Sequence, residues 1–216
     1  MKVGVIGSGG VAKALGSGFL KHGHEVVLGT RSPAKLAEWA GKQLGAGVGI
    51  GSFAEAAEFG EIVVLAVNGH VAAEALRLAG VANLKGKPVL DACNPIDESG
   101  PPVNGVLKLY TRMDESLMEQ LQREFSEAKF VKVFSSVGAA LMVDPQLKGG
   151  KPTMFICGND DGAKKATTKI LDEFGWETAD VGKVESARAI EPLCMLWCLP
   201  GFLNNDWMHA FKVLHE

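Results

Sequence analysis

The residues best suited to chemistry lie near the N-terminus, where small residues open a turn after the apolar run Val3–Ile6. Gly7, Gly9 and Ala12 follow this run at the spacing of a dinucleotide fingerprint. Gly7 permits a sharp turn, Gly9 lets a pyrophosphate approach bare backbone, and Ala12 lets the next helix pack closely. The free amides of a helix that begins near Gly10 suit the phosphates. The pattern therefore predicts dinucleotide binding.

The residues after the second apolar run, Glu25–Leu28, indicate which dinucleotide is bound. The run ends without the acidic residue that usually bonds the ribose of NAD. Polar and basic residues follow it instead, namely Thr30, Arg31, Ser32 and Lys35. Arg31 offers a planar fork and Lys35 a point charge, and both suit the 2′-phosphate of NADP. A solvated turn with an N-cap at Ser32 is the structural alternative, and both can hold at once. The sequence therefore favours NADP over NAD.

Apolar strands alternate along the chain with helices of about ten residues, which predicts βαβ units and a doubly wound, mainly parallel sheet. Such a sheet binds ligands at the carboxyl ends of its strands. This rule selects the segments after two further predicted strands, which contain Ala66, Val67, Asn68, Asn94 and Pro95. The amides of Asn68 and Asn94 could bond a ribose or a nicotinamide, or close Asx turns. We therefore predict a Rossmann-like α/β fold with its cofactor at this edge.

The predicted cofactor site combines the glycine turn with the residues that follow the next strands. In chain order its members are Gly7, Ser8, Gly9, Gly10, Val11, Thr30, Arg31, Ser32, Lys35, Ala66, Val67, Asn68, Asn94 and Pro95. The four cysteines form no CxxC pair, so packing in the core is their expected role. We predict neither a metal site nor a catalytic side chain.

The chain has 216 residues, enough for one α/β domain with an appendage. We predict a Rossmann NADP-binding domain over residues 1–144 and a smaller C-terminal α/β and helical appendage over 145–216. Within them we expect a short strand in 45–51, a polar helix over 114–128 and a strand over 130–134. The apolar positions of 184–214 recur at helical spacing, with an interruption at Pro200-Gly201.

The last predicted strand of the first domain ends in Ser135, Ser136 and Val137. These residues would lie at the ligand edge of the sheet, although plain turn residues are the structural alternative. The C-terminal segment carries more Trp and Phe than a cap on a small domain needs. We predict that part of this face, including Trp197, walls a flat aromatic substrate or is buried in a second subunit. A homodimer is slightly favoured.

Charge and hydropathy exclude several classes of partner. The formal net charge is -3, and no cluster of Lys and Arg is interleaved with aromatic residues, so nucleic acid is not expected. Met1 and Lys2 run directly into the first strand, so no signal peptide is expected. The most apolar long segment, 192–203, is too short to span a bilayer. We therefore expect a cytoplasmic protein without a membrane partner.

These motifs resemble a known family. The segment Gly29-Thr30-Arg31-Ser32-Pro33 after the glycine turn is similar to that of NADP-dependent oxidoreductases that reduce or reoxidise the deazaflavin coenzyme F420. The cytosolic NADPH-binding domain of six-transmembrane ferric reductases is similar over the same stretch. The likeness continues through 91–95, 132–138, 151–160 and 187–192, and so spans nearly the whole chain.

The resemblance implies hydride transfer between NADPH and a deazaflavin or flavin-like acceptor, with the segment around Ser135 flanking the nicotinamide and the second substrate. Many members of the family carry Asn or His where Ser135 stands, which leaves the acceptor open. Hydride transfer needs two rings face to face and does not demand a strong acid or base. Two alternatives stay open: an NADPH-dependent reductase of a small imine or carbonyl, and a non-catalytic NADPH-binding sensor or partner protein.

Overall fold

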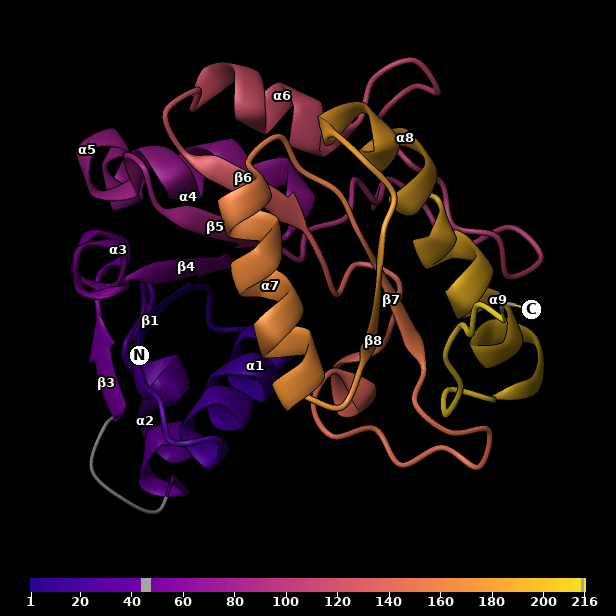
Figure 1. The fold of residues 1–216 in the computed structure, drawn as a ribbon, viewed down its shortest axis with the longest axis horizontal. Coiled ribbons are helices and arrows are strands. Elements are labelled where there is room, and N and C mark those ends of the chain that lie inside the picture. The colour runs from indigo at the N-terminus through magenta and orange to yellow at the C-terminus, as the bar shows by residue number, and fades with distance from the viewer. Residues whose placement is uncertain (44–47, 215) are drawn as a thin grey trace.

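The computed structural model describes residues 1–43, 48–214 and 216. Its main sheet has six strands in the order β3-β2-β1-β4-β5-β6, and every neighbouring pair is parallel. From β1 the chain moves outward to β3, returns to the other side of β1 with β4, and moves outward again (Figure 1). The predicted Rossmann-like, doubly wound α/β fold is confirmed.

Strands and helices of the main sheet alternate along the chain. The strands of the main sheet are β1 (Lys2–Ile6), β2 (Glu25–Gly29), β3 (Val48–Gly51), β4 (Ile62–Leu65), β5 (Pro88–Asp91) and β6 (Lys129–Lys132). Their helices are α1 (Gly10–Lys21), α2 (Ala34–Gly41), α3 (Phe53–Phe59), α4 (Ala72–Ala79), α5 (Val81–Leu84) and α6 (Leu117–Glu124). Short 3-10 turns lie at Gly69–Val71, Ala139–Leu141 and Val184–Ser186. The strand expected in 45–51 is β3, and residues 45–47 lie outside the described residues.

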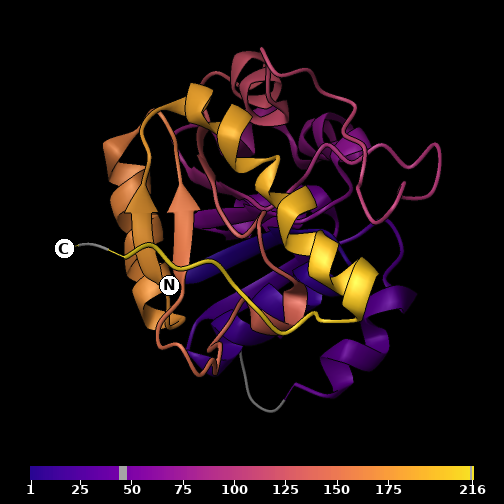
Figure 2. The same cartoon turned by 90° about the vertical axis from the view of Figure 1, so that its right-hand side faces the viewer.

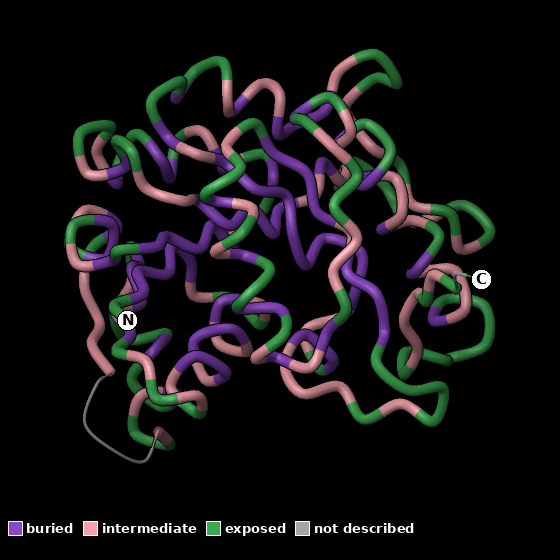
Figure 3. The backbone as a smooth tube through the Cα atoms, viewed as in Figure 1, coloured by how far each residue is buried: buried purple, intermediate pink, exposed green. Residues whose placement is uncertain are grey.

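Alternate residues of each strand face opposite helical layers. In β4, Ile62 and Val64 join an apolar cluster with α1, α2 and α7, whereas Val63 and Leu65 join one with α3, α4, α5 and α6. A strand covered on both faces is apolar at successive positions, which explains why β4 is a continuous apolar run. Figure 3 shows the buried residues concentrated along these strands. The two layers leave the carboxyl edge of the sheet for ligands.

A second, smaller sheet contains β7 (Thr153–Ile156) and β8 (Glu177–Asp180), which are parallel and are joined by α7 (Asp161–Glu173). Both strands run across the direction of the main sheet (Figures 1 and 2). An antiparallel bridge between Lys132 and Cys157 connects the end of β6 to the end of β7. Buried side chains of the small sheet, such as Met154, belong to the same apolar cluster as Val3 of β1.

The C-terminal segment differs from its prediction. Helices α8 (Ala187–Ile190) and α9 (Leu193–Asn204) follow β8, and α9 continues through Pro200 and Gly201. Pro200 lacks the amide hydrogen that would bond to the carbonyl of Leu196, one turn earlier. Leu196 is 53% exposed, so water can take the place of this donor. The helix ends instead at Asn205, whose φ of 54° is left-handed.

The predicted helical spacing beyond residue 204 is therefore wrong. Residues 205–214 form an irregular strip that returns from α9 to β7 (Figure 2). The amide of Thr153 donates to the carbonyl of Phe211 at 2.8 Å, and Trp207 packs against Gly201. A side chain on Gly201 would collide with that ring, since an added Cβ lies 2.3 Å from it. The aromatic residues of the strip thus attach it to the small sheet and to α9.

Two further elements are shorter than expected. The polar helix predicted over 114–128 begins at a capping box of Ser116 and Glu119 and ends before Phe125, whose ψ of 58° is not helical. The strand predicted over 130–134 ends at Lys132, and Phe134 takes a left-handed φ of 61°. A left-handed residue cannot continue a strand, so the chain turns sharply before Ser135.

Candidate functional site

A cleft of about 660 Å³ lies at the carboxyl edge of the main sheet. It brings together twelve of the fourteen predicted cofactor-binding residues, all except Asn94 and Pro95. The residues that sequence reasoning missed are Phe53, Val71, Glu74, Ala75, Leu78, Ala92 and Glu98. Most of them lie on α4 or in loops, where no single-sequence motif marks them. The cleft therefore joins the glycine turn, the edge after β2 and one face of α4.

The glycine turn has the geometry that a close-approaching ligand needs. Gly7 has a φ of 144°, and a Cβ built on it would lie 2.2 Å from the carbonyl oxygen of Ala66. Gly9 also lines the cleft, but a Cβ there would meet no protein atom within 4 Å. Helix α1 starts after Gly9 without a side-chain cap hydrogen bond. Its first amides and the open space beside Gly9 therefore fit a phosphate group.

The edge after β2 presents two exposed cations to the cleft. Thr30 is buried, and its hydroxyl accepts a hydrogen bond from the amide of Ser32 at 3.0 Å, which fixes the turn. Arg31 lies beside Glu74 of α4, with 3.6 Å between Nη1 and Oε1. Lys35 forms no ion pair within the described part of the chain. The alternative of an N-cap at Ser32 is wrong, because Pro33 holds the cap position of α2 without a side-chain cap bond.

Asn68 lines the cleft and closes a turn at the same time. Its Oδ1 accepts the amide of His70 at 2.9 Å, which is the Asx turn that we gave as an alternative. Its Nδ2 donates to Oε1 of Glu98 at 2.6 Å, and Glu98 belongs to the loop after β5. The two side chains thus connect the ends of β4 and β5 at the cleft. A contact between Asn68 and the cofactor stays a prediction.

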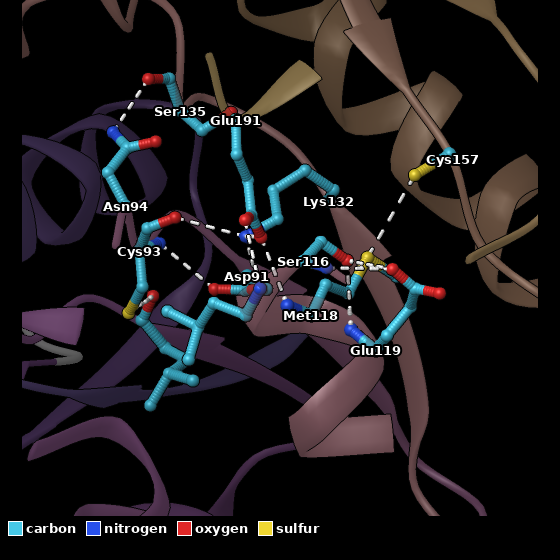
Figure 4. Close-up of polar contacts among 12 residues, drawn as sticks. Asp91, Cys93, Asn94, Ser116, Met118, Glu119, Lys132, Ser135, Cys157 and Glu191 are labelled. Carbon is cyan, nitrogen blue, oxygen red and sulfur yellow. Dashed lines mark hydrogen bonds and ion pairs between the residues drawn. The ribbon is translucent and has the colours of Figure 1, made fainter. Parts of the chain in front are cut away.

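Asn94 and Ser135 lie side by side beyond the cleft lining, after β5 and β6. Nδ2 of Asn94 donates to the backbone carbonyl of Ser135 at 2.7 Å (Figure 4). Oδ1 of Asn94 and the hydroxyl of Ser135 are buried, and neither has a hydrogen-bond partner among the described residues. Buried polar atoms are normally paired, so these two suit a polar group supplied by a ligand.

The other predicted site residues do not line the cleft. Pro95, Ser136 and Val137 are buried. Trp197 is only 7% exposed, and its indole N–H donates to the carbonyl of His209 at 2.8 Å. Its ring packs on Gly138, where an added Cβ would lie 2.4 Å away. The fold therefore places Trp197 beside the segment that follows β6, and its contact with a substrate stays a prediction.

A buried ion cluster supports these ligand-edge loops. Lys132 at the end of β6 is fully buried, with Nζ 2.6 Å from Oδ2 of Asp91 and 2.9 Å from Oε1 of Glu191 (Figure 4). Its contact with Oδ2 lacks hydrogen-bond geometry and is an ion pair. Burial disfavours the ammonium, but the two carboxylates outweigh burial and hold the pKa of Lys132 above its usual range. Lys132 therefore stays charged at neutral pH.

The same cluster fixes the backbone beside Asn94. Nζ of Lys132 donates to the carbonyl of Cys93 at 3.0 Å, and Oδ1 of Asp91 accepts the amide of Cys93 at 2.9 Å. Glu191 accepts the amides of Leu117 and Met118 at 2.9 and 3.0 Å, and so caps α6. No role was predicted from the sequence for Asp91, Lys132 or Glu191. A carboxylate and a lysine within apolar strands were nevertheless a usable signal of a buried ion pair.

Three comparisons bear on this geometry. The family model described as "NADP oxidoreductase coenzyme F420-dependent" matches residues 2–95. A crystal structure of a "putative f420 dependent nadp-reductase" from Arthrobacter sp. FB24 has 35% sequence identity and a TM-score of 0.92, with full coverage of both chains. The rat (Rattus norvegicus) protein "Metalloreductase STEAP3" is 30% identical over 208 residues. That match covers 94% of this chain but only 39% of the metalloreductase.

A reductive aminase from Aspergillus terreus, solved in complex with NADPH, shares the fold. Its identity is 15% and its TM-score 0.68, with 94% of this chain and 63% of that chain covered. At this identity the likeness concerns the fold alone.

Proposed function

The chain belongs to the family of coenzyme F420-dependent NADP oxidoreductases, and from that premise we propose that it transfers hydride between NADPH and a deazaflavin or flavin-like acceptor. The observation that carries the proposal is the cleft in which the glycine turn faces Thr30, Arg31 and Lys35. An amide-lined turn suits a pyrophosphate, and a neighbouring pair of cations suits an additional phosphate. Three smaller cavities in the described residues do not combine these two features.

We assign the residues of the cleft to successive parts of NADPH. The turn from Gly7 to Val11 holds the pyrophosphate, and Thr30 to Lys35 hold the adenosine 2′-phosphate. Asn68 and the orphaned atoms of Asn94 and Ser135 receive the nicotinamide end. NADPH supplies the hydride, and the acceptor gains two electrons and takes its proton from solvent. The protein's task is then to orient two rings and exclude water, which needs no acid or base in the chain.

The segment that follows β6 is where we place the second substrate. We propose that Ser135, Ser136 and Val137, with Trp197 behind them, form the wall against which the acceptor binds. The buried Ser135 hydroxyl, which has no hydrogen-bond partner among the described residues, supports this placement. We also propose the division into a cofactor domain over 1–144 and an appendage over 145–216, which contributes Trp197 to this wall, a dimer interface, or both.

Stopped-flow oxidation of NADPH in the presence of a deazaflavin, a free flavin or a small cyclic imine tests the proposal. We expect rapid oxidation with the deazaflavin or the flavin and none with the imine. Oxidation by the imine alone would favour the alternative of an imine or carbonyl reductase, to which the reductive aminase fold is related. NADPH binding without oxidation by any acceptor would favour a sensor.

The glycine turn gives a prediction that separates binding from folding. In Gly9→Ala the methyl group enters the space assigned to the pyrophosphate, so NADPH affinity should fall about tenfold. The free energy of unfolding should change by less than about 0.5 kcal/mol, because no protein atom is displaced. Gly7→Ala is the matched control, since its methyl collides with Ala66 and should destabilise the protein by about 1–3 kcal/mol. Titration and urea unfolding measure both; unchanged NADPH affinity in Gly9→Ala would contradict the placement of the pyrophosphate.

The location and the oligomeric state are further proposals. Within the part of the chain that the structure describes, none of the helices is both long and apolar enough to cross a bilayer. We propose a cytoplasmic location and a homodimer that buries the exposed apolar side chains of α9, Leu196, Phe202 and Leu203, which are 53%, 45% and 61% exposed. Light scattering coupled to gel filtration checks the dimer, and a monomeric mass at assay concentration would exclude it.

A further inference from the structure

We infer that Glu74 is a specificity-determining residue, whose carboxylate competes with the 2′-phosphate of NADPH for the guanidinium of Arg31. The inference rests on the proposed function, because it concerns the phosphate that distinguishes NADPH from NADH. It adds a residue from α4 to a recognition site whose other members all follow β2.

The geometry places the two charges on different elements that meet at the cleft. Arg31 follows β2, Glu74 lies in the first turn of α4, and both side chains line the cleft. The distance of 3.6 Å between Nη1 and Oε1 is that of an ion pair and exceeds that of a hydrogen bond. The side chains are 65% and 57% exposed, so the pair is weak and a better partner can replace it.

A phosphate is such a partner. It carries up to two negative charges and three acceptor oxygens, and the planar fork of Arg31 can bond two of them at once. Binding of the phosphate therefore exchanges the contact with Glu74 for a stronger one. This exchange lowers the net free energy that the phosphate contributes to binding. The carboxylate that is left beside the phosphate also repels it, because both groups are negatively charged.

The surrounding charges single out Glu74 for this role. Glu98, the other carboxylate that lines the cleft, is bonded to Asn68 at the end of β4. Lys35 pairs with no carboxylate among the described residues, so its charge is already available to a phosphate. NADH has a hydroxyl where NADPH has the phosphate, and its binding does not require Arg31 to leave Glu74.

The variant Glu74→Gln tests the inference, because it keeps the size of the side chain and removes only its charge. Fluorescence titration of the full chain should show NADPH affinity rising about three- to tenfold and NADH affinity changing less than twofold. The gain should shrink at high ionic strength, since both groups are exposed. The matched control is Glu127→Gln, which breaks an exposed pair with Lys85 away from the cleft lining and should leave both affinities unchanged.

The same titrations in an Arg31→Ala background separate competition for Arg31 from simple repulsion. If Glu74 acts by holding Arg31, the gain from Glu74→Gln should fall by at least about half there. An undiminished gain in that background, or an unchanged or reduced preference for NADPH in Glu74→Gln alone, would overturn the inference. The proposed function fails by a different result, namely a wild-type protein that binds neither coenzyme or does not prefer NADPH, and the inference would fall with it.

Discussion

Replacing Arg31 with Ala is expected to weaken NADPH binding by about ten- to a hundredfold, because a charge-assisted hydrogen bond contributes roughly 1.5–3 kcal/mol. The guanidinium lines the cleft and is 65% exposed, so it can reach a bound phosphate without rearrangement of the fold. NADH affinity should barely change, since NADH lacks the group that Arg31 recognises. Equilibrium titration with both coenzymes measures the difference.

A matched arginine controls for the loss of charge. Arg77 of α4 is also exposed, at 59%, and pairs with Glu124 at 2.7 Å, but it does not line the cleft. Arg77→Ala should leave both affinities within about twofold of the wild type. If Arg31→Ala weakens the binding of NADPH and NADH equally, Arg31 is a general binding residue. It then does not account for a preference for NADP over NAD.

The parts of the fold and of the site that the sequence predicted are those encoded within short segments. The strand β4 is recognisable because a parallel strand covered on both faces must be apolar at successive positions. The glycine turn and the edge after β2 are equally local, because each is a contiguous set of residues beside one strand end. Together with Ala66, Val67 and Asn68 after β4, they supply twelve of the nineteen residues that line the cleft.

The parts that were missed depend on contacts between distant segments. Glu74 reaches the cleft only because the fold brings α4 and the residues after β2 to the same cavity, which no spacing rule specifies. Pro200 was expected to interrupt a helix, but the residue one turn earlier, Leu196, is exposed, which makes the missing donor tolerable. Asp91 and Lys132 become partners through the register of β5 on β6, which pairs them directly.

That register leads to the largest effect on stability that we expect. Lys132→Met should lower the free energy of unfolding by about 3–5 kcal/mol, because it leaves two carboxylates buried without their cation. Lys132, Asp91 and Glu191 are 0%, 0% and 1% exposed, so water cannot replace the ammonium. Met has a similar length and fills the same space. Urea unfolding followed by tryptophan fluorescence, to which the buried Trp176 contributes, measures the loss.

Two further variants separate charge compensation from packing. Lys85→Met removes a lysine from an exposed pair with Glu127 and should cost less than about 1 kcal/mol. Adding Asp91→Asn and Glu191→Gln to Lys132→Met removes the uncompensated charges and should recover part of the loss. Full recovery is not expected, because the single oxygen of Gln cannot replace both oxygens that accept the α6 amides. No recovery would show that the cost comes from lost packing. Because Lys132 also holds the carbonyl of Cys93 next to Asn94, the recovered protein should still bind NADPH less tightly than the wild type.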